Sequence, residues 1–169
     1  NIKSITDPKW KKTEFNYDKL NRITSIKNAK NHTTTYEYDK IWNLLKTTDA
    51  KGNINSYVYD SLNRLTKITD ALWNKIETTY DANGNVLSIK DKNGNVNSYN
   101  YDALNRIIKS INANNSFTSY SYDSNGNILK ERKYVNGLSD GEWKEYYIDG
   151  SIKSIIKFKK SKVISIERF

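Results

Sequence analysis

The stretch YDALNRIIKSINANNSFTSYSYDSNGN, from Tyr101 to Asn127, holds two Tyr-Asp dipeptides, at positions 101–102 and 122–123. The same dipeptide also begins at positions 17, 38, 59 and 80, so every step along the chain has the same length. The N-terminal segment keeps this register, because Ile2, Ile5 and Phe15 each lie one period before an apolar or aromatic residue. Self-similarity at a fixed period is the signature of a repeat architecture.

Each unit contains two clusters of turn-forming residues. The dipeptide is followed by two residues and then, in most units, by Asn-Arg or Gly-Asn. A second polar cluster, such as DAKGN or DKNGN, comes later in the unit. Such clusters between β-prone segments are typical of tight turns. Two turns per unit leave room for two strands of the usual length of about five or six residues. The sequence therefore predicts an all-β fold of tandem 21-residue β-hairpin repeats in a curved or spiralling antiparallel sheet.

The alternation of side chains predicts which residues share a face of this sheet. Tyr57 and Tyr59 are two positions apart, so they point to the same side of a strand, and the other units repeat this pair. The second strand of each unit is less regular, since Ile23 and Ile26 are three positions apart. A β-bulge or a strong twist would place such a pair on one face.

Composition limits the kinds of protein that the chain can be. It has 169 residues, 36% of them hydrophobic, which suits one domain with a thin core. Cysteine and methionine are absent, and the opening NIKSITD suggests a piece of a longer protein. The net charge of +9 favours acidic partners. We expect no cofactor and no specific nucleic-acid partner. We also expect no membrane span, because no apolar run approaches the roughly 20 residues that a membrane-spanning helix requires.

The unit Y-D-x-x-[NG]-[RN]-[LIV] resembles the YD or RHS repeat, and the match extends over residues 1–133. The resemblance implies a segment of a spiralling β-sheet shell, as in bacterial polymorphic toxins, insecticidal toxin complexes, wall-associated proteins and teneurins. It also implies a secreted or cell-surface bacterial protein whose main partner is the rest of its own polypeptide. The family is often described as carbohydrate-binding, so acidic glycans or cell-wall polymers are the second expected partner.

The period breaks after residue 133, because Trp143 stands where the next Tyr-Asp would begin. The segment GLSDGEWKEYYIDGSIKSIIKFKK resembles a MORN-variant repeat, on the positions of Gly137, Gly141, Trp143, Tyr146, Tyr147 and Gly150. We therefore expect residues 134–169 to form a separate basic cap, which ends in a hairpin around the turn KKSK. Repeat arrays need an atypical terminal unit to protect their edge strand.

The residues that catalysis or metal binding would need are mostly missing. His32 is the only histidine and is expected in an exposed turn. The aspartate of Tyr-Asp occurs once in each unit, whereas glycosidases need one pair of carboxylates at a fixed separation. An aspartate at the start of a turn can instead accept the backbone N–H of the second residue after it. The segments DANGNV and DKNGNV lack the spacing of an EF-hand calcium loop. No catalytic or metal-binding residue is therefore predicted.

Five residues remain as candidates for binding a glycan or a polyanion. Trp73 falls in the second turn of its unit, where most units have Gly or Asn, and an indole there either folds back on the sheet or is exposed to ligand. The other four are the lysines of the last hairpin, Lys157, Lys159, Lys160 and Lys162. Lysines are also common on exposed edge strands, where they prevent pairing with another chain.

Three functions are compatible with the sequence. The first is a non-catalytic structural scaffold from a larger secreted or surface protein. The second is a module that binds carbohydrate or anionic cell-wall or host glycans. The third is a toxin fragment with its own activity, although the residues that such an activity needs are missing.

Overall fold

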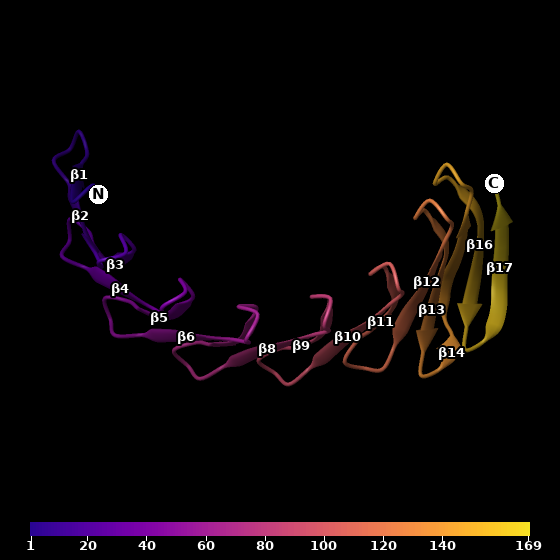
Figure 1. Cartoon of the computed structure of the whole chain (residues 1–169). Helices are drawn as coiled ribbons and strands as arrows, with labels where there is room; N and C mark the ends of the chain where they lie inside the picture. Colours follow the sequence, from indigo (N-terminus) through magenta and orange to yellow (C-terminus); the bar gives the residue numbers. More distant parts are fainter. The chain divides into compact units, whose positions relative to one another are not determined.

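The computed structural model describes all 169 residues and contains seventeen β-strands and no helix. Every strand pairing is antiparallel, which confirms the all-β prediction (Figure 1). No segment of the chain forms a helix that could cross a membrane. By its contacts the chain divides into two units, residues 1–77 and residues 78–169, and the boundary falls within one strand.

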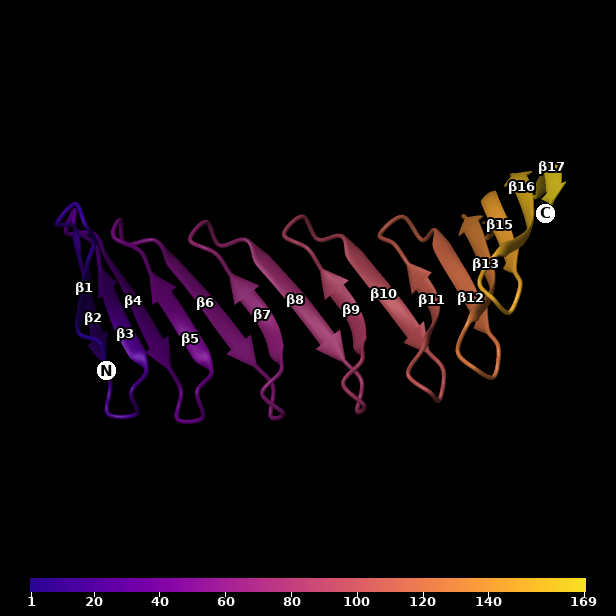
Figure 2. The same ribbon diagram turned by 90° about the horizontal axis from the view of Figure 1, so that it is seen from above.

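The N-terminal unit consists of short strands that pair with their neighbours in chain order. In Figure 2 these strands, in indigo and purple, lie side by side with their turns at alternate ends. They are β1 (Ser4–Thr6), β2 (Lys12–Tyr17), β3 (Ile23–Lys27), β4 (Thr33–Tyr38), β5 (Leu44–Thr48), β6 (Ile54–Tyr59), β7 (Leu65–Thr69) and the first part of β8 (Lys75–Tyr80).

The C-terminal unit continues this pattern and then changes. Its strands are β9 (Val86–Lys90), β10 (Val96–Tyr101), β11 (Ile107–Ile111), β12 (Phe117–Tyr122), β13 (Ile128–Val135), β14 (Leu138–Ser139), β15 (Gly141–Tyr146), β16 (Ile152–Lys159) and β17 (Lys162–Arg168). β13 and β16 have eight residues each, against five or six in β2 to β12. Strands longer than those of the array therefore occur where the sequence period breaks. The division at residue 133 itself stays a prediction.

The turns of the array are five-residue loops with a common geometry. In the loop that begins at Asp102, the backbone N–H of Asp102 donates to the carbonyl of Arg106 at 2.9 Å. The N–H of Asn105 donates to the carbonyl of Asp102 at 3.0 Å, and Asn105 has a left-handed backbone with φ of 61°. The hydrogen bond between Asp102 and Arg106 encloses the three residues 103–105. A type I turn followed by a left-handed residue is a common hairpin connection of this length. It accounts for Asn or Gly at the fourth position of the loop.

A β-bulge lies next to each Tyr-Asp turn of the array for which the pairing is defined. Tyr17 pairs with Ile23 and Asn16 pairs with Ser25, which leaves Thr24 without a residue directly opposite. The extra residue brings Ile26 opposite Phe15. Apolar residues three apart therefore face the same side as the aromatic pair. Of the bulge and the strong twist that the sequence left open, the structure shows the bulge.

In the N-terminal unit the sheet has one aromatic face and one polar face, and no side chain of the protein is fully buried. Tyr57 pairs with Ile68 and Tyr59 with Leu65, so these four side chains lie on the aromatic face. Lys46 and Glu37 pair directly across the opposite face and form an ion pair at 2.9 Å. A single layer removes little area from water, so cross-strand contacts of about 0.2–1 kcal/mol each must contribute much of the stability.

Candidate functional site

The aspartates of the Tyr-Asp pairs hold the turns together. Asp102 Oδ1 accepts the backbone N–H groups of Leu104 at 2.9 Å and Arg106 at 3.0 Å, while Oδ2 accepts Nε of Arg106 at 2.7 Å. The same contacts recur in the other units, with Asn in place of Arg in some. The predicted role for aspartate, as acceptor of the N–H of the second residue after it, is confirmed.

These contacts also set the charge of the carboxylates. The pKa of Asp102 is lowered, first by the backbone N–H of Arg106 and then by its guanidinium, against an opposing effect of desolvation. The pKa of Asp123 is likewise lowered, chiefly by the side-chain amide of Asn127. A general acid needs a carboxyl that keeps its proton near neutral pH, and these groups are shifted in the opposite direction. They therefore act as charged acceptors within the turns.

In several repeats the tyrosine of the Tyr-Asp dipeptide makes a hydrogen bond that the sequence did not indicate. The hydroxyls of Tyr101 and Tyr122 donate to the carbonyls of Val86 at 2.9 Å and Ile107 at 2.6 Å, in each case 15 residues earlier. Burial is the main reason why the pKa of both tyrosines is raised. Each of these tyrosine side chains is thus held at one end by its own strand and at the other by the hydrogen bond of its hydroxyl.

Trp73 lies at a turn with its indole in solvent. Its side chain is 82% exposed, and its backbone is left-handed with φ of 65°. Trp10 shares both properties, with 88% exposure and φ of 61°, and Trp42 is 60% exposed with φ of 78°. An L-residue with a large side chain adopts this conformation at a cost, so three tryptophans there are unusual. Sequence reasoning did not select Trp10, although it occupies the same position of the repeat as Trp73.

An open pocket of about 320 Å³ lies beside Trp73. It is lined by the turn residues Gly52, Asn53 and Asp70 and by Ser56 and Thr69 from the polar face. A tryptophan next to hydroxyl and amide groups offers both a stacking surface and hydrogen-bonding partners for a sugar.

The four candidate lysines occupy the last hairpin and differ in their surroundings. Lys157 forms ion pairs with Glu167 at 3.2 Å and Glu142 at 3.8 Å, so its charge is largely compensated. Lys159 and Lys162 are directly opposite each other across the two-residue turn Lys160–Ser161. This places three lysines around one turn and confirms the predicted hairpin. Like charges directly opposite are destabilising.

The lysines belong to the C-terminal unit and Trp73 to the N-terminal unit, so they are two separate candidate surfaces. His32 lies in an exposed turn, where its backbone N–H donates to Asn28 Oδ1 at 3.1 Å. No group of three or more His, Asp or Glu side chains is arranged to hold a metal ion.

A row of four aromatic rings in contact crosses the C-terminal unit, on the face opposite Tyr120, and was not predicted. Phe117 and Tyr134 have ring centroids 4.4 Å apart, Tyr134 and Trp143 5.2 Å, and Trp143 and Phe158 4.5 Å. Lys109 lies 4.0 Å from the centre of the Phe117 ring. The ring faces are occupied by one another and by a cation, so the row stabilises the sheet and leaves few faces free for a ligand.

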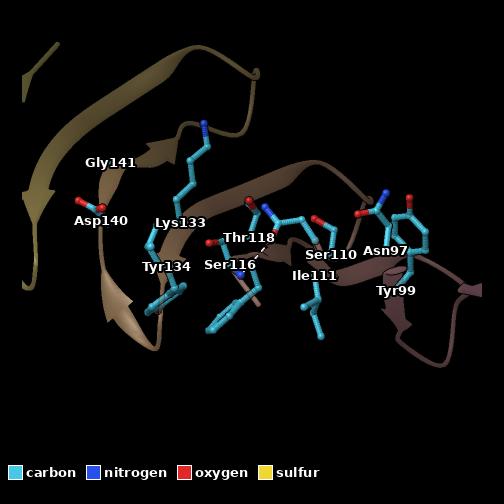
Figure 3. A pocket seen from close by; sticks show the side chains of 13 residues that line it. Asn97, Tyr99, Ser110, Ile111, Ser116, Thr118, Lys133, Tyr134, Asp140 and Gly141 are labelled. Atoms are coloured by element: carbon cyan, nitrogen blue, oxygen red, sulfur yellow. Dashed lines mark hydrogen bonds between the residues drawn. The ribbon is translucent and has the colours of Figure 1, made fainter. Parts of the chain in front are cut away.

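An open pocket of about 490 Å³ adjoins this row. Figure 3 shows Tyr134 and Ile111 on one side of the strands and Lys133 and Thr118 on the other. The hollow is open to solvent and is not enclosed as a catalytic cleft would be.

Comparison with known proteins identifies relatives of the whole architecture. The family model for the teneurin YD-shell matches residues 1–97 and residues 41–156. No curated protein sequence matches the chain. The crystal structure of TcdB2-TccC3-TEV is similar over 90% of this chain and 12% of that one, with 14% identity and a TM-score of 0.51.

Two further solved structures are similar over a comparable range. The crystal structure of TcdB2-TccC3 is 15% identical, with a TM-score of 0.46, over 94% of this chain and 13% of that one. A Tc holotoxin pore of Photorhabdus luminescens is 15% identical, with a TM-score of 0.46, over 93% and 12%. The chain thus spans about an eighth of the length of the solved structures that it resembles.

Proposed function

The chain belongs to the teneurin YD-shell family, and on this premise we propose that it is a non-catalytic segment of a shell wall, built together with the rest of its parent polypeptide. As part of the same proposal, the parent protein acts outside the cell. The observation that carries the proposal is the contrast between an aromatic and a polar face in the N-terminal unit of a chain that has no fully buried side chain.

This contrast is what a wall requires. In a single-layer sheet, the side chains of the apolar face shield that face from water only in part. The rest of the parent polypeptide can therefore pack against it. The turns support the same reading, because their charged aspartates are used in holding the loops. A repeated structural contact in each unit makes a uniform surface, whereas an enzyme concentrates its special residues in one place.

The absence of cysteine permits a clean test with single-cysteine variants. Asn55 lies on the same face as Tyr57, and the adjacent Ser56 lies on the opposite face. We expect both Asn55→Cys and Ser56→Cys to react with a bulky PEG-maleimide in the isolated chain. Within the full parent polypeptide, one of the two should become protected. Equal reaction of both variants in the parent polypeptide would contradict a wall.

A second candidate function is the binding of anionic glycans or cell-wall polymers, and the lysine turn favours it. Three lysines around the turn at residues 159–162 include a directly opposed like-charged pair, and a polyanion would relieve this repulsion. The ion pairs of Lys157 make that residue the weakest member of the set.

Retention on a heparin resin tests this candidate. Changing Lys157, Lys159, Lys160 and Lys162 to Gln should lower the salt concentration at which the protein elutes, because fewer counterions are released on binding. The matched control changes Lys19, Lys40, Lys51 and Lys92, which are exposed lysines of the array turns, and removes the same net charge. Equal shifts for the two variants would mean that only net charge matters. An unchanged elution with greater aggregation of the first variant would instead support edge protection.

A further inference from the structure

The Tyr-Asp turns are of two kinds, and the two kinds alternate along the chain. At the fifth position of the turn, Arg and Asn follow each other strictly. Arginine-type turns, with Asn-Arg at their end, are residues 18–22, 60–64 and 102–106. Asparagine-type turns, with Trp-Asn or Gly-Asn at their end, are residues 39–43, 81–85 and 123–127. The chemistry of this edge of the sheet therefore repeats with every second unit, at twice the period of the Tyr-Asp dipeptide.

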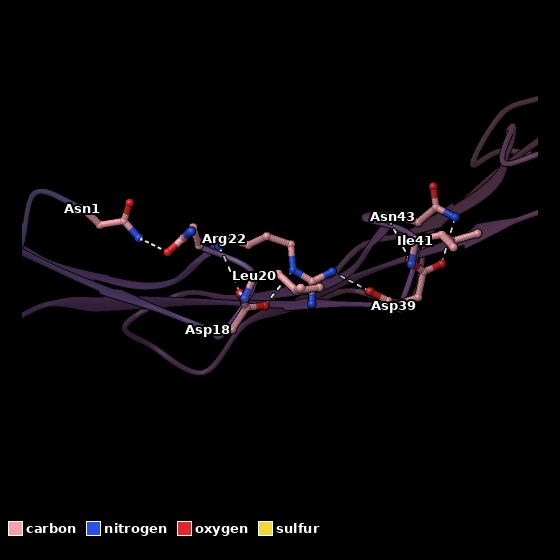
Figure 4. A network of polar contacts seen from close by, with 8 residues as sticks. Asn1, Asp18, Leu20, Arg22, Asp39, Ile41 and Asn43 are labelled. Carbon is pink, nitrogen blue, oxygen red and sulfur yellow. Dashed lines mark hydrogen bonds and ion pairs between the residues drawn. The ribbon is translucent and has the colours of Figure 1, made fainter.

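An asparagine-type turn contacts the next turn through its side-chain amide. Nδ2 of Asn43 donates to Oδ1 of Asn63 at 3.1 Å, and Nδ2 of Asn85 donates to Oδ1 of Asn105 at 2.8 Å. The acceptor in each case is the left-handed asparagine of an arginine-type turn. Asn1 makes the equivalent contact to Asn21 at 2.7 Å (Figure 4).

An arginine-type turn contacts the next turn in a different way. The guanidinium of Arg22 donates to the backbone carbonyl of Asp39 (Figure 4). It also lies 4.8 Å from the centre of the Tyr38 ring. Arg106 repeats this arrangement, with the carbonyl of Asp123 at 3.2 Å and the Tyr122 ring at 4.5 Å. The Arg22 side chain is only 11% exposed, which is low for a sheet with no buried side chain.

The two kinds of contact are not interchangeable. The left-handed position of an asparagine-type turn is Trp42, Gly84 or Gly126, none of which has a side-chain oxygen to accept an amide. An asparagine-type turn placed before another one would therefore lose its acceptor. An arginine-type turn placed before another one would meet a left-handed asparagine whose usual amide donor is missing.

We infer that each Tyr-Asp turn is a recognition surface for a neighbouring turn of the opposite type, so that the building block of the array is a pair of units. The partner of each surface is the adjacent turn of the same polypeptide. This arrangement solves a problem of repeated sequences, in which a strand can pair one whole unit out of register at little cost. A slip of one unit brings turns of the same type together, whereas a slip of two units is the first that restores the contacts.

Two deletions separate this inference from ordinary repeat behaviour. Deleting residues 33–53 removes one unit and places the turn at residues 18–22 next to the one at 60–64, which is of the same type. Deleting residues 33–74 removes two units and places it next to the turn at 81–85, which is of the opposite type. If each repeat contributes to stability independently of its type, deleting two repeats costs more stability than deleting one. We expect the reverse, with a lower Tm for the shorter deletion in thermal melts followed by circular dichroism. An equal or lower Tm for the longer deletion would overturn the inference.

Point variants keep the test decisive should the shorter deletion fail to fold. Asn105→Gly removes the acceptor of Asn85 and retains a residue suited to the left-handed backbone. The matched control is Asn115→Gly, which changes a left-handed asparagine with φ of 57° in the turn at residues 112–116, which does not follow a Tyr-Asp dipeptide. We expect Asn105→Gly to lower Tm by about 2–4 °C and the control to leave Tm unchanged or higher. If Asn105→Gly lowered Tm no more than the control, recognition between turns would be refuted.

Discussion

Removing one hydroxyl should show how much the tyrosine contacts stabilise the sheet. Tyr122→Phe deletes the hydroxyl that donates to the carbonyl of Ile107 at 2.6 Å but leaves the ring beside the guanidinium of Arg106. The net value of a neutral hydrogen bond is about 0.5–1.5 kcal/mol, and the half-buried carbonyl loses this donor. We therefore expect a loss of about 1 kcal/mol, which corresponds to about 2–4 °C in Tm for a chain of this length.

The control for this change lies two positions away on the same strand. Tyr120 is also half-buried in β12, but its hydroxyl has no hydrogen-bond partner in the structure. Tyr120→Phe should therefore change stability by less than about 0.5 kcal/mol. Both variants can be compared by urea unfolding followed by circular dichroism, with the free energy taken from the midpoint at a common slope.

The outcome that would refute the reasoning is an equal effect of the two substitutions. It would mean that the hydroxyl of Tyr122 finds an equally good partner in water and that only the rings stabilise the sheet. Tyr122→Ala then measures the ring alone, and we expect about 2 kcal/mol, below the range for a fully buried aromatic because the site is half-exposed.

Two further predictions concern the turns. The pKa values of Asp102 and Asp123 are lowered in the folded chain, so their stabilisation is present above the unfolded pKa of about 3.9 and is lost as the pH falls through the folded values. Tm should therefore fall between pH 5 and pH 2, and it should fall less in Asp102→Asn; an equal fall would mean that this carboxylate does not contribute. Trp73→Gly should raise stability by up to about 1 kcal/mol, because glycine has no penalty at φ of 65° and the exposed indole packs little. Trp10→Gly should behave alike, and a fall in Tm for both variants would show that the indoles are packed after all.

The local features of the fold could be predicted from the sequence because they depend on neighbouring residues. The turns follow from Asp, Asn and Gly at fixed positions, and the bulge follows from the spacing of Ile23 and Ile26. The role of Asp102 was predictable for the same reason, since its backbone partners are Leu104 and Arg106 of the same turn.

Contacts between neighbouring 21-residue repeats could not be predicted, because they depend on the register in which strands of different repeats pair. The bond from Tyr122 to Ile107 and the bond from Asn85 to Asn105 both require the bulge to be placed correctly first. The compensation of Lys157 by two glutamates on neighbouring strands is of the same kind. Charge in the sequence showed a basic hairpin, but the pairing of strands decides which of its lysines are free to bind.

The lack of a buried core has a consequence for how the protein responds to temperature. The heat-capacity change of unfolding is dominated by the apolar surface that becomes hydrated, and a sheet without a fully buried side chain has little of it to expose. The stability curve of the isolated chain should therefore be shallow, with its maximum spread over a wide range of temperature. Covering the aromatic face would increase the area hidden from water and sharpen this curve. Calorimetry could thus register enclosure of the sheet as a change in curvature as well as a shift in midpoint.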